Sequence, residues 1–510
     1  MTATLTPRQQ ALGLAVLTVA VFWPTLFAGF VYDARLQILS DDFIHDPRNW
    51  VSVLTFGVLG RDVLDFNRPV HLASLMLDAA IWGREPFGYH LTSVLLHAGN
   101  VVLLGAVIRG LAGQKQAFAG LGAVLFAVHP IVTEAVCEPT FREDLLATAF
   151  SLGALLLAMR HDGAARGGDR MRAIAVAVCC LLAVGSKESG FAAPLLVAIF
   201  WWLCRRDEPS GFWRAGIGGG LAVTAAFLGA RFLLEPEQSA IFEVRPEYPG
   251  GSFLTAMQIE PRLLALYTQL VLFPVNLCAD YGLSSVRHLP LPVALALVAA
   301  VVGAAILTIR ADRRMLLAVA MIALPLLPVS NVIPIYRAAA DRYLYFPLAG
   351  IGLAIGLFLD SAWLGARPRL REVAAIGCLA AAVLLGLACN ERQKVWASPV
   401  ALWEDTHRKN PGSFTAAVGL AEALREVGRL PEAERRAREA IRLSQERRGE
   451  AWAVLALVLD GQGRDAEALA AAEKAIELNA KLADPASRVR ALAMERQFAE
   501  EWGRLLGRRK

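Results

Sequence analysis

The chain has 510 residues, of which 56% are hydrophobic and 19% are charged, and its net charge is +5. A soluble globular protein usually carries about 25% charged residues. Long stretches between residues 11 and 389 contain no ionisable side chain, whereas residues 390–510 are dense in arginine and glutamate. We infer lipid around the first part and water around the second. The small net charge argues against a nucleic-acid-binding protein.

The N-terminal apolar run is nearly long enough to span a membrane, and no A-x-A cleavage site precedes Tyr32, so we interpret it as a retained first span. A span needs roughly 20 apolar residues. The sequence predicts eleven spans, near 11–30, 89–109, 117–137, 144–160, 171–186, 189–204, 215–234, 289–309, 314–333, 342–360 and 372–389. Two shorter apolar stretches, 69–82 and 262–277, are predicted to be interfacial or re-entrant helices.

Basic residues gather after the even-numbered spans, as in Arg109, Arg160, Arg205, Arg310 and Arg367. Positive charge marks the cytoplasmic side of a membrane. The opposite side then holds the loops 31–88 and 235–288 and the whole tail from residue 390. We therefore expect a cytoplasmic N-terminus and a periplasmic tail. The Ala/Arg/Leu-rich composition and the absence of an organelle signal favour a bacterial inner membrane over the endoplasmic reticulum.

The tail contains a repeat. Residues 419–443 align with residues 454–478, so that Gly428 pairs with Gly463 at a spacing of 35. Tetratricopeptide repeats have a period of about 34 residues and consist of helix–turn–helix units. We predict repeats at about 413–446 and 448–481, followed by a capping helix over 485–508. A groove for a peptide or protein and a stabilising cap without its own ligand both fit this tail.

Ionisable residues gather at the turns on the predicted outer side, where charges near lipid are costly and are often functional. Asp33 directly follows the first span, and an anionic carboxylate at that depth is suited to act as a general base. The other turns carry His129, Glu134, Arg142, Asp144, Lys187, Glu188, Asp280, Tyr281, Arg337, Asp341, Arg342 and Tyr343.

This mixture of charges suits sugar transfer from a lipid-linked phosphate donor. Cations hold a phosphate leaving group through charge-assisted hydrogen bonds. One carboxylate removes the proton of an acceptor hydroxyl as that hydroxyl attacks the sugar. We therefore predict Asp33 as the catalytic base, and Arg142, Lys187, Arg337 and Arg342 as donor-phosphate ligands. The remaining outer residues are predicted to support them, and no metal site or cofactor is predicted. The sequence has no P-loop and no HExxH motif.

The order of motifs resembles that of the transmembrane and tetratricopeptide-repeat O-mannosyltransferases and their bacterial relatives. The runs that carry the resemblance are GFVYD, NRPVHLASLMLD, FGYHLTSVLLH, FAVHPIVTEAV, FREDLL, SKESG, LFPVNLCADY, LPVSNVIP and ADRYLYFP, followed by the repeats. The resemblance implies an all-α membrane bundle of the GT-C glycosyltransferase type, a polyprenyl-phosphate sugar donor, typically mannose, and a hydroxyl acceptor outside the cytoplasm. In this family an acidic pair follows an aromatic residue at the start of the first outer loop. Tyr32 and Asp33 match its first part, and Ala34 occupies the place of the second acid.

The sequence thus predicts an inverting glycosyltransferase with a membrane domain over 1–389 and a repeat domain over 390–510. Its predicted partners are the lipid-linked donor, membrane lipids and a protein or glycan acceptor, which the repeats would hold. Two alternatives stay open. The first is a catalytically degenerate scaffold for envelope proteins, which Ala34 in place of the second acid would fit. The second is a transporter of lipid-linked sugars, although a transporter is expected to place charges near the middle of the membrane.

Overall fold

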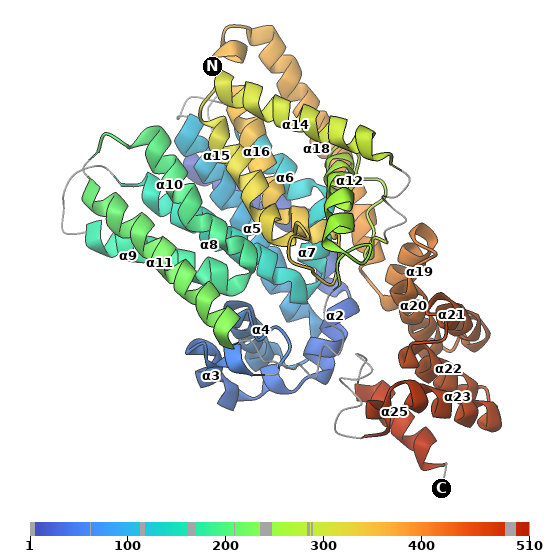
Figure 1. The fold of residues 1–510 in the computed structure, drawn as a ribbon. Helices are drawn as coiled ribbons and strands as arrows, with labels where there is room; N and C mark the ends of the chain where they lie inside the picture. The colour runs from blue at the N-terminus through green and yellow to red at the C-terminus, as the bar shows by residue number, and fades with distance from the viewer. Residues whose placement is uncertain are drawn as a thin grey trace.

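The computed structural model describes residues 6–61, 63–112, 118–161, 169–208, 210–234, 247–282, 286, 289–484 and 496–508. Within these residues the regular structure is helical and contains no strand, which confirms the predicted all-α class. The apolar helices form a bundle, and the C-terminal helices form an arm at one end of it (Figure 1). The elements of the first loop, α2 (Tyr32–Ala34), α3 (Trp50–Leu54) and α4 (Pro69–Trp82), lie at that same end, and the N-terminus lies at the other.

Five helical segments in the described residues are long and apolar enough to cross a membrane. They are α5 (Pro86–Ala112), most of α11 (Gly211–Leu234), α14 (Leu291–Ala311), Asp341–Gly365, which contains α16 (Tyr345–Asp360), and α18 (Pro368–Val395). The helix α1 (Pro7–Val21) and the segment Trp23–Ser40 make a sixth span if the pair, bent by 48°, is counted as one. A multi-span bundle is confirmed, but the predicted number of eleven is not.

The other expected spans are interrupted or begin with charges. The helices α8 (Arg142–Met159) and α9 (Asp169–Ser186) each carry three ionisable residues among their first four. The helices α6 (Leu121–Val128) and α15 (Met315–Ala323) end just before Pro130 and Pro325. Proline disfavours helical geometry in the residue before it, and His129 before Pro130 is extended, so α6 stops there. At Pro325 the chain instead tightens into a 3-10 helix over Leu324–Val329. The short helix α10 (Ala192–Cys204) begins after a 3-10 turn at Glu188–Phe191.

Of the two predicted interfacial or re-entrant helices, one has the predicted bounds and the other is displaced. The predicted interfacial helix 69–82 is α4, with the same bounds. The predicted stretch 262–277 is displaced, because α12 spans Phe253–Leu272 and begins at a Ser252 cap whose side chain accepts a hydrogen bond from the backbone N–H of Thr255.

The arm begins later than expected, because α18 continues to Val395, beyond the predicted boundary at 389. An additional helix, α19 (Pro399–Lys409), precedes the two predicted helix pairs. These pairs are α20 (Phe414–Glu426) with α21 (Leu430–Leu443), and α22 (Gly449–Gly461) with α23 (Asp465–Leu478). The helix α25 (Arg496–Gly507) follows, and residues 485–495 of the predicted capping helix lie outside the described residues.

The two repeat glycines occupy the positions that the sequence alignment gives them. Gly428 and Gly463 each follow the first helix of a pair, with φ of +75° and +73°. This left-handed conformation costs glycine little because glycine has no Cβ.

Candidate active site

The turn that carries Asp33 is held by aromatic rings from three parts of the chain. Tyr32 has φ of +50°, which is unfavourable for a bulky residue and indicates that its surroundings fix it. Its ring stacks on Trp403 of α19, with centroids 5.3 Å apart, and meets Phe141 edge-on at 5.6 Å. The first loop, the connection between α7 (Thr133–Cys137) and α8, and the arm therefore converge on the residue before Asp33.

Asp33 lies just beyond the first expected span and keeps an accessible side chain. No hydrogen-bond partner of its carboxylate is found among the described residues. Desolvation by the surrounding protein raises the pKa of Asp33 to about 6, and the positive charges of Arg342 and Arg337 limit this rise. An accessible carboxylate with a pKa near neutrality is suited to accept a proton.

Two arginines flank this carboxylate. The Arg337 guanidinium lies 5.6 Å from the centre of the Tyr32 ring and pairs with Asp280. The Arg342 guanidinium lies 3.9 Å from the centre of the Phe141 ring and pairs with the buried Glu134. A guanidinium has five N–H donors. The side-chain bonds found in the described residues engage only Nη1 of each arginine, so each retains donors for an anion.

A second group of charges lies around Lys187. Its ammonium group pairs with Asp144 and lies 3.6 Å from Glu143. Arg68 bridges this group by contacting Glu143 at 3.2 Å and Glu188 at 3.3 Å. Burial alone would raise the pKa of Glu188, but Arg68 and Arg231 outweigh it and lower that pKa to about 2.

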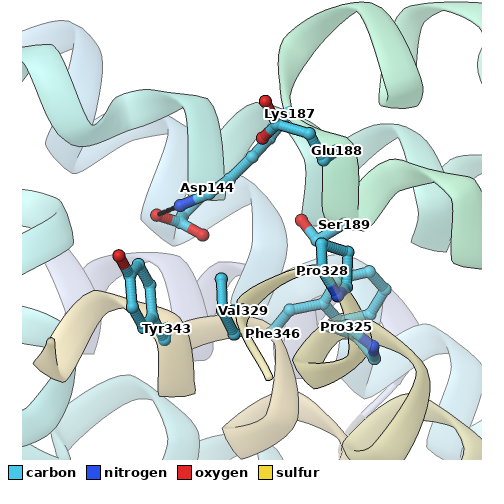
Figure 2. Close-up of a pocket in the computed structure, with 9 residues that line it drawn as sticks. All are labelled: Asp144, Lys187, Glu188, Ser189, Pro325, Pro328, Val329, Tyr343 and Phe346. Carbon is cyan, nitrogen blue, oxygen red and sulfur yellow. Dashed lines mark hydrogen bonds and ion pairs between the residues drawn. The ribbon is translucent and has the colours of Figure 1, made fainter. Parts of the chain in front are cut away.

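Three members of this second group, Asp144, Lys187 and Glu188, line one side of a pocket (Figure 2). Lys187 reaches toward Asp144 across it, and Tyr343 comes from the segment that also carries Arg342. The facing wall is apolar and consists of Pro325, Pro328, Val329 and Phe346. The pocket therefore offers polar and apolar surfaces side by side.

Arg142 is separate from both groups. Its side chain has no exposed surface. Its guanidinium donates to Asp78 at 2.5 Å, to the Ser74 hydroxyl at 3.1 Å and to the Tyr89 carbonyl at 2.7 Å. These bonds join α8 to α4 and α5. Arg142 is therefore enclosed by protein groups, which does not support the phosphate-binding role predicted from the sequence.

The remaining predicted residues attach the membrane helices to each other and to the arm. His129 Nε2 lies 3.0 Å from the Val271 carbonyl oxygen. Tyr281 donates to Asp341 at 2.5 Å. Asp280 accepts from the Ser413 hydroxyl, and its carbonyl accepts from Asn410 at 2.9 Å. Asp280 therefore links Arg337 to the first residues of the repeat region.

No family model matches the chain. It is 34% identical over 206 residues to protein O-mannosyl-transferase Tmtc1 of Drosophila melanogaster, covering 39% of this chain and 24% of that protein. It is 25% identical over 447 residues to protein O-mannosyl-transferase F38B6.6 of Caenorhabditis elegans, covering 84% of this chain and 62% of that protein. The solved structure of ArnT from Cupriavidus metallidurans bound to undecaprenyl phosphate covers 98% of this chain and 89% of its own, with 18% identity and a TM-score of 0.38.

The chain is thus similar in sequence to proteins named protein O-mannosyl-transferases. The matches span less than two thirds of the length of these two relatives.

Sequence reasoning assigned no role to three residues that shape this candidate site. Arg68 lies within the NRPVH run and bridges two acidic turns. Trp403 belongs to a helix outside the predicted repeats. Glu138 is fully buried, and its carboxylate accepts a hydrogen bond from the backbone N–H of Ala34 at 3.0 Å. The one available signal for Glu138 was an ionisable residue before a proline, between two apolar stretches.

Proposed function

We propose that this protein is an inverting glycosyltransferase of the GT-C type. It would move a sugar from a polyprenyl-phosphate donor to a hydroxyl group on the non-cytoplasmic side of the membrane. Mannose is the sugar that the names of the relatives suggest. The observation that carries the proposal is the accessible Asp33 carboxylate with Arg337 and Arg342 beside it.

In the proposed reaction the acceptor oxygen attacks the anomeric carbon from the face opposite the phosphate. The Asp33 carboxylate takes the hydroxyl proton while the new carbon–oxygen bond forms. The bond between the anomeric carbon and the phosphate oxygen breaks, and polyprenyl phosphate leaves with the electron pair. One displacement of this kind inverts the configuration, and because phosphate leaves without needing a proton, a single carboxylate suffices.

The free N–H groups of Arg337 and Arg342 are our proposed ligands for the donor phosphate, because charge-assisted hydrogen bonds stabilise the charge that develops there. Lys187 lies at the pocket but pairs with acidic residues, so its proposed role is to keep the pocket wall neutral. Arg142 is reassigned to holding helices together.

The arm is the proposed acceptor platform. Arg35 of the first loop contacts Glu426 of α20 at 2.5 Å, and Asp280 contacts Ser413, so the arm begins beside the site. We propose that the arm, which follows α18, is a periplasmic tetratricopeptide-repeat domain, and that the protein lies in a bacterial inner membrane.

The test is turnover of a purified polyprenyl-phosphate mannose by the full-length protein in lipid nanodiscs. We expect the wild type to release polyprenyl phosphate and Asp33→Asn to lose at least ~100-fold in rate, because general-base catalysis contributes about 10²–10⁴-fold. Asp46→Asn is the matched control, since Asp46 is another acid of the first loop and contacts Arg48 at 2.8 Å. Wild-type turnover in Asp33→Asn would remove Asp33 as the base.

A further inference from the structure

Glu138 lies between α7 (Thr133–Cys137) and the 3-10 turn Pro139–Phe141, and none of its surface is exposed. Its Oε1 atom accepts three hydrogen bonds. They come from the Thr140 hydroxyl at 2.7 Å, the Thr140 backbone N–H at 3.3 Å and the Ala34 backbone N–H at 3.0 Å. Its Oε2 atom is buried and has no partner among the described residues.

The two bonds to Thr140 are local and are those expected of a residue that caps a short turn. The bond to Ala34 is not local, because it joins positions 104 residues apart in the sequence. It ends on the peptide that directly follows Asp33. The same turn holds Tyr32 at a positive φ, so its backbone needs outside contacts to keep its shape.

Burying a carboxylate with one unpartnered oxygen is costly, and a polar group in that state usually has a functional reason. Burial, reinforced by the negative charge of Asp33, raises the pKa of Glu138 well above its ordinary value. Burial and the Asp33 charge therefore both favour the protonated form, in which Glu138 holds the Asp33 turn without adding a second negative charge beside the base.

We propose that Glu138 is a positioning residue for Asp33, acting through its hydrogen bond with the Ala34 backbone N–H. This inference rests on the proposed function. Ala34 has an apolar side chain with no exposed surface, so its peptide N–H is the polar group through which the protein can fix this side of the turn.

Three variants separate the Glu138 bond to Ala34 from its local bonds to Thr140. Glu138→Asp is shorter by one methylene group, so it can still cap the Thr140 turn but cannot reach the Ala34 N–H. Glu138→Gln keeps an acceptor oxygen at full reach. Thr140→Val removes a local bond and leaves the Ala34 contact in place.

The experiment measures kcat and donor KM with polyprenyl-phosphate mannose in nanodiscs, per folded protein. We expect Glu138→Asp to lower kcat by roughly 10- to 100-fold at an unchanged donor KM, because small misplacements of a catalytic group cost up to about 10²-fold. Glu138→Gln and Thr140→Val should both keep kcat within about threefold of the wild-type value.

Wild-type kcat in Glu138→Asp would overturn the inference, and so would an equal loss in Thr140→Val, which would make Glu138 a turn cap only. A misfolded Glu138→Asp would also overturn it, because the residue would then be needed for the fold. Failure of the proposed function gives a different result, since the wild type itself would not turn over the donor.

Discussion

At the scale of single residues, the contacts of each acid decide its part in the site. Asp144, Asp280 and Asp341 all engage cations or hydroxyl groups, whereas the accessible Asp33 carboxylate has no hydrogen-bond partner among the described residues. The sequence treats these residues alike, because all four lie at turns on one predicted side. Only their contacts separate a candidate base from acids that hold the structure.

The pKa of Asp33 predicts how activity depends on pH. A general base works only when it is deprotonated, and the pKa of Asp33 is raised to about 6. We expect kcat to fall about tenfold per pH unit below about pH 6 and to reach a plateau above pH 7. A kcat profile from pH 4.5 to 8 in nanodiscs checks this. A flat profile across that range contradicts the assignment.

Arg337 makes a second prediction at this scale. Arg337→Gln keeps a polar side chain but removes the positive charge beside Asp33. Hydrogen bonds to charged groups contribute about 1.5–3 kcal/mol, so the donor KM should rise by roughly 10- to 150-fold. Arg48→Gln is the control, because Arg48 is a cation of the first loop with 88% of its side chain exposed. An unchanged donor KM in Arg337→Gln would show that this arginine does not bind the phosphate.

At the scale of helices, the charged turns lie where α-helices end near prolines or pass into 3-10 turns. The helix α6 stops before Pro130, and α15 stops before Pro325. Buried ion pairs then join the pieces, and the Arg142–Asp78 pair between α8 and α4 is fully enclosed.

Breaking that pair should destabilise the fold. Arg142→Leu leaves the Asp78 carboxylate buried without its cation, which costs about 3–5 kcal/mol. We expect a clearly lower Tm in detergent. The matched variant adds Asp78→Asn, which removes the charge but keeps an acceptor for the Thr92 hydroxyl, now 2.7 Å from Asp78. The double variant should recover part of the loss, and a double variant as unstable as Arg142→Leu would disprove the explanation.

At the scale of the whole molecule, composition predicted the class of fold well. The helical class, the multi-span bundle, the bounds of α4 and the glycine turns of the arm all follow from hydropathy and repeat spacing. The number of spans does not, because hydropathy windows do not register the breaks at Pro130 and Pro325 or the charges that open α8. The Glu138–Ala34 and Tyr32–Trp403 contacts join distant segments, so only the folded chain reveals them.

The predicted sidedness can be tested directly. Arg48 in the first loop and Arg435 in α21 are well exposed, as is Arg206 after α10. In a background without cysteine, we expect Arg48→Cys and Arg435→Cys to react together with a membrane-impermeant thiol reagent added from the outer side. Arg206→Cys should react only after the membrane is opened. Labelling of Arg48→Cys and Arg435→Cys from opposite sides would contradict the proposed placement of the arm.

We propose that Asp33 serves as the single base in a direct displacement from the lipid phosphate. This claim can be checked by NMR, which gives the anomeric configuration of the product formed by the wild type and by Asp33→Asn side by side. We predict a product with the configuration opposite to that of the donor, and no measurable product from Asp33→Asn. A product that retains the donor configuration, or one that forms equally well without the Asp33 carboxylate, would contradict the claim.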